Sequence, residues 1–162
     1  MAGIVGEVAR AIWDALVQEV MPVPTTEDWQ SIATDFLHRW NFPNCLGSID
    51  GKHVVVRGTY SVVLLSYRKA QYCFRVVDVG SYGRTSDGGV LANSTFGQAL
   101  RDGTLGLPQD ALLPGAEHLG PQPHVFVADE AFPLRRDLMR PFPGHNLSGR
   151  HRVFNYRLSR QG

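Results

Sequence analysis

The sequence predicts an α/β protein in which helices flank a sheet of mixed strand direction. Helical patterns fill the first 40 residues, strand-like apolar runs begin at Cys45, and helical and strand patterns then alternate. The 162 residues, 43% of them hydrophobic, can form one domain with a substantial core. We therefore expect an N-terminal helical segment, residues 1–40, followed by a sheet-containing domain, residues 41–162.

The N-terminal segment is expected to hold two amphipathic helices. Apolar spacing predicts the first from about Ile4 to Val20, and the prolines of residues 21–24 end it. Thr25 can cap the second helix in a capping box with Asp28. Its apolar stripe, which we expect in the core, consists of Trp29, Ile32, Ala33, Phe36, Leu37 and Trp40.

The middle of the chain has the texture of strands. Residues 45–56 predict one strand, with Asp50-Gly51 as a turn or kink, and residues 61–65 and 74–79 predict two more. A tight connection over residues 67–71 would join these into an antiparallel meander.

The second half alternates between loops and short elements. We expect a glycine-rich loop over residues 80–89, a helix over 90–100, a long loop over 103–123 and an apolar strand over 124–129. Pro133 can open a short helix that ends at Met139. The tail from Arg140 is basic.

Charge and cysteine content limit the function classes. The net charge of +1 does not favour a strongly basic nucleic-acid binder, so any such contact must use local patches. Cys45 and Cys73, with no secretory segment, predict reduced thiols in an intracellular protein. No run approaches the roughly 20 apolar residues of a membrane span, so we expect no membrane partner. The histidines lack zinc-site spacing.

Three aspartates lie where strands are expected to end: Asp50, Asp87 and Asp129. Carboxylates delivered to one point from separate elements suit a hard divalent cation such as Mg²⁺. Such a site supports phosphodiester cleavage, because bound cations stabilise the attacking and leaving oxygens. The other interpretation is that these aspartates form turns and helix caps. Glu130 follows Asp129 as a further ligand or a solvated neighbour.

Several motifs, in order, resemble one nuclease family. The run WNFPNCLGSIDGKH, residues 40–53, resembles the first catalytic motif of the Harbinger-type transposase-derived nucleases, members of the DDE endonuclease superfamily. The runs VDVG, residues 77–80, and YGRTSDGG, residues 82–89, resemble the second motif, and VADEAFPL, residues 127–134, resembles the third. The run FNYRLSR, residues 154–160, is similar to the segment just before the family's final glutamate.

The resemblance implies an RNase H-like fold and DNA as the substrate. It also implies that Asp50, Asp87 and Asp129 are catalytic ligands of Mg²⁺ or Mn²⁺, that a separate DNA-binding protein is a partner, and that the protein works in the nucleus and/or the cytoplasm. The family continues into a helix with a last acidic ligand, whereas this sequence stops at Gln161-Gly162. The segment after His53 is also shorter than in the family. These departures predict a truncated or alternatively spliced form, or an imperfect gene model, which is either an active nuclease or an inactive protein retained for binding.

Some residues allow two interpretations. Lys52 and His53 either face a scissile phosphate or are ordinary strand residues. Asp78 either makes structural hydrogen bonds, which is the favoured interpretation, or takes part in catalysis. The tail arginines either grip a DNA backbone or cover a solvated surface.

Overall fold

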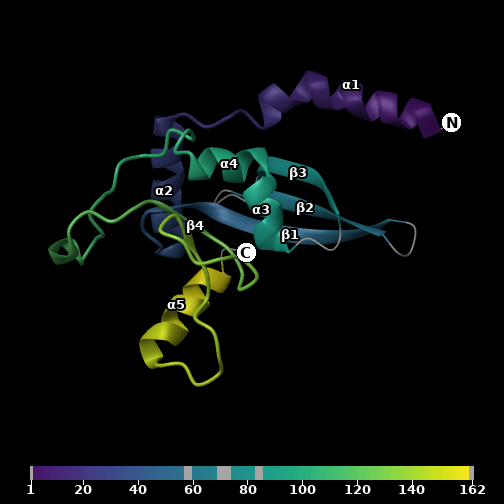
Figure 1. Ribbon diagram of the computed structural model, residues 1–162. Helices are drawn as coiled ribbons and strands as arrows, with labels where there is room; N and C mark the ends of the chain where they lie inside the picture. Colours follow the sequence, from purple (N-terminus) through teal and green to yellow (C-terminus); the bar gives the residue numbers. More distant parts are fainter. Residues whose placement is uncertain (1, 57–59, 69–73, 83–85, 161–162) are drawn as a thin grey trace.

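The computed structural model describes the backbone of residues 2–56, 60–68, 74–82 and 86–160. Figure 1 shows their arrangement. The helices are α1 (Ala2–Val20), α2 (Thr26–Trp40), α3 (Asp87–Asn93), α4 (Thr95–Arg101) and α5 (Gly149–Ser159), with a 3₁₀ turn at Glu117–Leu119. The strands are β1 (Cys45–Val56), β2 (Tyr60–Arg68), β3 (Phe74–Tyr82), β4 (Val125–Val127) and β5 (Leu138–Met139).

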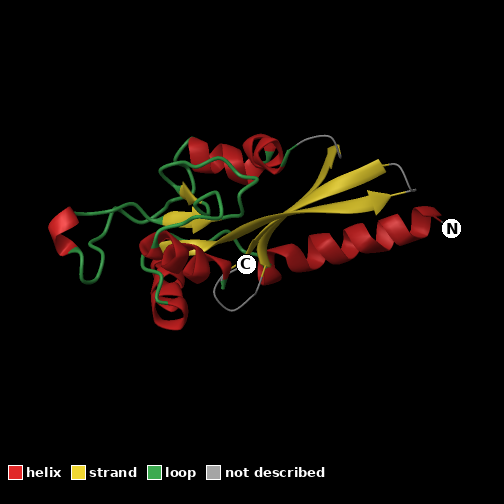
Figure 2. Ribbon diagram, turned by 90° about the horizontal axis from the view of Figure 1, so that it is seen from below, coloured by secondary structure: helices red, strands yellow, loops and turns green. Residues whose placement is uncertain are grey.

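The described strands form one sheet in the order β3-β2-β1-β4-β5. β1 pairs with β2 and β2 with β3 in antiparallel direction, whereas β4 runs parallel to β1 and β5 parallel to β4. The prediction of an α/β protein is therefore confirmed. The three long strands extend beyond the body of the molecule, and α1 lies beside them (Figure 2).

The two N-terminal helices form where their spacing predicts them, but they pack differently. In α2 the capping box is present, because Thr25 accepts from the Asp28 amide and the Asp28 carboxylate accepts from the Thr25 amide. Its apolar stripe is buried from Trp29 to Phe36. Six large apolar side chains of α1 are instead 46–72% exposed, and they are Ile4, Val5, Val8, Ile12, Trp13 and Leu16.

Phe126, on the short strand β4, lies at the centre of the core and is fully buried. Its ring makes edge-to-face contacts with Trp29 of α2 at 5.7 Å and Phe96 of α4 at 5.3 Å between centroids. The Trp29 indole N–H donates to the Leu105 carbonyl at 3.0 Å. Phe126 therefore packs β4 against α2 and α4, and Trp29 connects α2 to the start of the long loop.

The expected turn at Asp50-Gly51 is wrong, because β1 continues without a break from Cys45 to Val56. Asp50 pairs with Ser66 and Gly51 with Leu65, so ladder hydrogen bonds to β2 outweigh the local turn signal. The expected loop over residues 80–89 is also shorter than predicted, because β3 reaches Tyr82 and α3 begins at Asp87.

The helix expected over residues 90–100 is two helices that meet at Ser94. The Ser94 hydroxyl donates to the Leu91 carbonyl and accepts from the Gly97 amide, so this residue ends α3 and caps α4. A Cβ on Gly97 would come within 1.7 Å of the Leu91 carbonyl oxygen. The close approach requires glycine, and the helical spacing did not reveal it.

The helix expected over residues 133–139 is wrong, since this segment forms a turn and strand β5. The Phe126 amide donates to the Asp137 carbonyl and the Ala128 amide to the Met139 carbonyl, each at 2.9 Å. Arg135 holds Asp137 through a bidentate ion pair at 2.8 and 2.9 Å. Pairing with β4 satisfies backbone groups that an isolated short helix would leave open.

The basic tail contains α5, an element absent from the prediction. Ser148 caps its start, and Phe154 packs between Phe42 and Phe142 with centroid distances of 5.9 and 5.3 Å. The Arg160 guanidinium lies 5.7 Å from the ring centres of both Trp40 and Tyr156. Within the described part of the chain, no helix is long and apolar enough to cross a membrane.

Candidate active site

The candidate active site is a pocket of about 240 Å³ that Asp50 and Asp129 share. Asp50 comes from β1, and Asp129 is the second residue after β4. Both side chains are exposed to solvent. The floor is mainly apolar, and the last turn of α5 closes one side with Leu158 and Ser159.

Strand register explains why these two carboxylates meet. In the parallel pair of β1 and β4, Ser48 lies opposite Val127. Asp50 is two residues further along β1, and Asp129 is two residues past Val127, just beyond the end of β4. Adjacent strands are about 4.8 Å apart, so this register leaves the two residues close enough to line one pocket. An Asx turn fixes the Asp129 side chain, whose Oδ1 accepts from the Ala131 amide at 2.9 Å.

Ser48 adds a third polar group to the pocket. The residue is 4% exposed, and its hydroxyl has no hydrogen-bond partner among the residues that the structure describes. Ser48 lies on the same face of β1 as Asp50, two positions before it. A buried hydroxyl without a partner is costly, so this oxygen is available for a polar group that enters the pocket.

Asp87 lies at a different point from the other two aspartates. It is the first residue of α3, behind the Ser86 cap, and its carboxylate lies against the backbone of Gly51. A Cβ on Gly51 would come within 2.6 Å of the Asp87 Cγ. Because successive residues on a strand face opposite sides, this contact lies on the side of β1 opposite to the Asp50 side chain.

The donor set of the pocket suits a hard cation only in part. Two carboxylates and a hydroxyl are oxygen donors, and Mg²⁺ commonly uses one or two carboxylates and completes its shell with water or phosphate. Across the described residues, however, no group of three or more His, Cys, Asp or Glu side chains could hold a metal ion. The described part of the pocket therefore offers two carboxylates and one hydroxyl as oxygen donors.

Cys45, on β1 near this pocket, is not available for nucleophilic chemistry. The thiol is fully buried, and burial raises its pKa well above the usual range. It therefore stays protonated at neutral pH and acts as a core side chain.

The candidate site lies within a segment that matches a known family. The family of DDE superfamily endonucleases matches residues 50–162, which is more than two thirds of the chain, and the match begins at Asp50. The chain therefore belongs to the DDE superfamily endonucleases. No curated protein and no solved structure matches the chain.

Sequence reasoning missed Ser48 and the end of α5. In the first motif only Asp50 was considered as a site residue, and Ser48 was not. Its spacing of two residues from Asp50 is nevertheless a signal that both side chains lie on the same face of a strand. The Leu158-Ser159 wall has no such signal, because it depends on how α5 docks. Glu130 is exposed beside Asp129. The side chains of Lys52, His53 and Asp78, and the whole of Cys73, lie outside the described part of the structure.

Proposed function

We propose that this protein is a divalent-metal-dependent nuclease that cleaves DNA phosphodiester bonds. The observation that carries the proposal is the shared pocket, in which parallel strand register brings Asp50 and Asp129 to one wall beside the buried Ser48 hydroxyl. Membership of the DDE superfamily endonucleases supports DNA as the substrate.

In this proposal Asp50 and Asp129 hold Mg²⁺ or Mn²⁺. An ion held by these two carboxylates would supply an activated water and would stabilise charge on the phosphate. Ser48 donates a hydrogen bond to a phosphate oxygen that enters the pocket.

The fold and motifs support a narrower assignment. Three antiparallel strands followed by parallel strands support an RNase H-like sheet, and the motif order supports the Harbinger-type transposase-derived nucleases. The nuclease domain would comprise residues 41–162, and the helical segment 1–40 would contribute α2 to its core. We propose work in the nucleus and/or the cytoplasm, with a separate DNA-binding protein as partner.

Cleavage of a labelled DNA duplex in Mn²⁺ tests the proposal. We expect Asp50→Asn and Asp129→Asn each to lower the cleavage rate at least about 100-fold, because each removes a ligand of the ion. Asp102→Asn is the control, since Asp102 is an exposed partner of Arg101 at 3.1 Å. Cleavage that survives both pocket substitutions, or requires no divalent ion, would refute the proposal.

The role of Asp87 needs its own measurement. The family resemblance proposes a catalytic metal ligand, whereas the contact with Gly51 supports a positioning residue that fixes α3 against β1. Titration of Asp87→Asn with Mn²⁺ separates the two roles. Lower metal affinity at unchanged melting temperature favours the ligand, and the reverse result favours the positioning residue.

A second candidate function is an inactive family member retained for binding protein or DNA. The observation that favours it is the lack of a three-ligand cluster among the described residues. It predicts no Mn²⁺-dependent rise in melting temperature and no cleavage, with DNA or protein binding retained. A metal-dependent stabilisation that Asp50→Asn abolishes would exclude it.

A further inference from the structure

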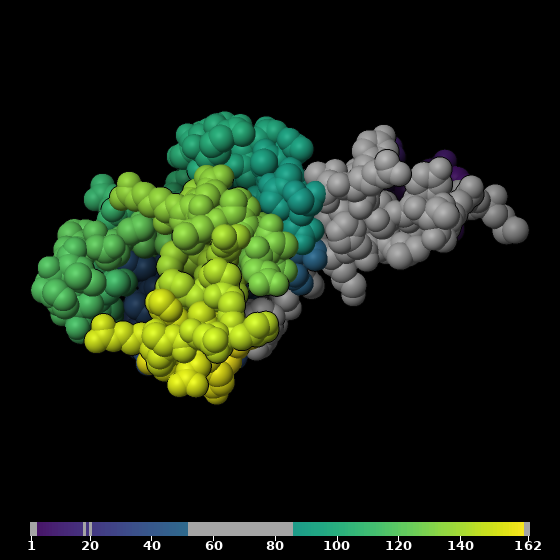
Figure 3. Space-filling view, turned by 60° about the horizontal axis from the view of Figure 1, so that its bottom comes forward, coloured from purple at the N-terminus to yellow at the C-terminus, as the bar shows by residue number. Residues whose placement is uncertain are grey.

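A second hollow, which we call the arginine groove, lies between α5 and the long loop over residues 103–123. It has a volume of about 440 Å³. Figure 3 shows a hollow between the green long loop and the yellow C-terminal residues, with dark blue residues from the first part of the chain at its floor. The apolar groups that line it are Phe42, Leu113, Val125, Met139, Val153 and Phe154.

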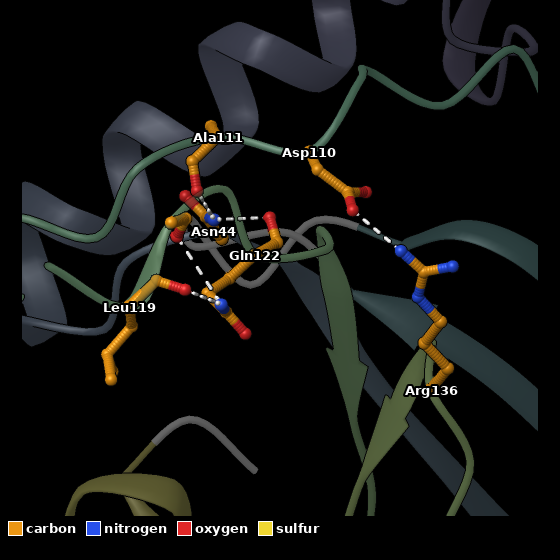
Figure 4. Close-up of polar contacts among 7 residues, drawn as sticks. Asn44, Asp110, Ala111, Leu119, Gln122 and Arg136 are labelled. Carbon is orange, nitrogen blue, oxygen red and sulfur yellow. Dashed lines mark hydrogen bonds and ion pairs between the residues drawn. The ribbon is translucent and has the colours of Figure 1, made fainter. Parts of the chain in front are cut away.

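The wall of the groove is fixed by hydrogen bonds (Figure 4). The Asn44 side-chain amide donates to the carbonyls of Ala111 at 3.2 Å and Gln122 at 3.1 Å. Ala111 and Gln122 also bond each other through both backbone pairs, at 2.8 and 2.9 Å. Asn44 adopts φ of 54°, a conformation that asparagine tolerates well. The long loop is therefore held open as one wall, and a ligand that binds there needs little reorganisation.

The rim of the groove is positively charged. Arg136, Arg150 and Arg157 line it, and no Asp or Glu is among the described lining residues. Asp110 balances one charge through an ion pair to Arg136 at 2.6 Å. Arg150 and Arg157 are exposed on α5, and their spacing from Val153 places all three on one helix face.

We propose that the arginine groove binds an acidic peptide segment of a partner protein, anchored by an apolar side chain. Arg150 on the rim can pair with a carboxylate in a bidentate manner, Arg136 and Arg157 add positive charge beside it, and the apolar floor can bury an aromatic or aliphatic anchor. A DNA backbone is a poorer fit, because its sugar-phosphate surface offers no apolar anchor for Val153 and Phe154. The groove is separate from the pocket of Asp50 and Asp129, so it can bind a partner without blocking that site.

Selection from a phage-displayed random peptide library tests this inference. The bait is the full chain carrying Asp50→Asn, so that the result does not depend on cleavage. We expect the selected peptides to be rich in Asp and Glu beside Phe, Trp or Leu. We then expect the double substitution Arg150→Glu and Arg157→Glu to lower the affinity for the best-binding synthetic peptide at least about 10-fold, as measured by fluorescence anisotropy.

Two controls make the test specific. Arg152→Glu changes the same charge on an exposed residue of the same helix, outside the groove lining, and should retain most of the affinity. Val153→Ser should lower the affinity for the peptide, although this substitution leaves the charge of the groove unchanged. Far-UV circular dichroism of each variant confirms folding.

Three outcomes would overturn the inference. They are selection of neutral or basic peptides, equal losses for Arg152→Glu and the double variant, and displacement of the peptide by a short DNA duplex whose own binding has the same Val153 dependence. None of these outcomes bears on Mn²⁺-dependent cleavage, so the two proposals fail separately.

Discussion

The pocket of Asp50 and Asp129 and the arginine groove use different parts of the same helix and carry opposite charge. The last turn of α5, at Leu158 and Ser159, closes the acidic pocket, whereas Arg150, Val153 and Arg157 line the groove. Strand β4 also contributes to both, through Val125 in the groove and Val127 in the pocket. The acidic pocket is the one proposed to hold a cation with phosphate, and the groove is the one proposed to hold a carboxylate-bearing partner.

The substitution with the largest expected effect destabilises the core behind both the pocket and the groove. Phe126→Ala should lower the free energy of unfolding by about 3–5 kcal/mol, since it removes a fully buried ring between Trp29 and Phe96. Chemical denaturation measures this. Phe142→Ala is the control, because Phe142 is 41% exposed and should cost much less. Equal losses for the two variants would show that β4 does not organise the core.

The next substitution affects only the groove. Asn44→Gly keeps the positive φ but removes both hydrogen bonds to the long loop, at a cost of about 1–2 kcal/mol. Asn41→Gly is the matched control for stability, because Asn41 caps α2 in the left-handed conformation, where glycine is favourable. Asn41 also lines the groove, so this variant is not the control for peptide affinity. Peptide affinity should fall with Asn44→Gly while Mn²⁺ affinity stays unchanged. A parallel loss of Mn²⁺ affinity would mean that the hollows are coupled.

Two serines of equal burial test the acidic pocket instead of the groove. Ser48 and Ser94 are each 4% exposed, but only the Ser94 hydroxyl makes hydrogen bonds that the structure describes. We expect Ser94→Ala to lower stability by about 1–2 kcal/mol and Ser48→Ala to leave it unchanged or raise it by up to about 1 kcal/mol. Thermal melts in EDTA give both values.

Ser48→Ala should also weaken the binding of DNA in Mn²⁺ a few-fold, while peptide binding in the groove is unaffected. A large loss of stability in Ser48→Ala would indicate that the hydroxyl already has a structural role, and it would remove Ser48 from the proposed site.

The smallest expected effect is the pH dependence of His124, which lies next to Asp110 near the groove wall. Partial burial lowers the pKa of His124, and the Gln109 backbone and the Asp110 charge oppose this shift. Because the pKa is lower in the folded state, His124 contributes stability above the unfolded pKa of about 6.5, and this is lost as pH falls toward the folded value. The melting temperature should fall slightly less on acidification in His124→Gln than in wild type. His118→Gln, at an exposed histidine, is the control.

Local patterns predicted much of the secondary structure. The capping box at Thr25 and the apolar stripe from Trp29 depend on residues three and four apart, so the sequence contains all the information that forms them. Predictions failed where a distant partner decides. Residues 133–139 become a strand because β4 offers hydrogen bonds, and residues 90–100 divide because Ser94 and Gly97 hold two helices close together.

The sequence by itself determined the amphipathic helices, the strand-rich middle of the chain and the motifs that hold Asp50, Asp87 and Asp129. Only the tertiary structure decided which of these aspartates meet, because parallel register of β1 and β4 aligns Asp50 with Asp129 and places Asp87 behind Gly51. It also decided that the basic tail forms α5 and that the arginine groove exists. Both results depend on packing between segments far apart in the chain, such as Phe42 against Phe154, 112 residues apart, and Asn44 against Ala111, 67 residues apart. No local pattern encodes such contacts.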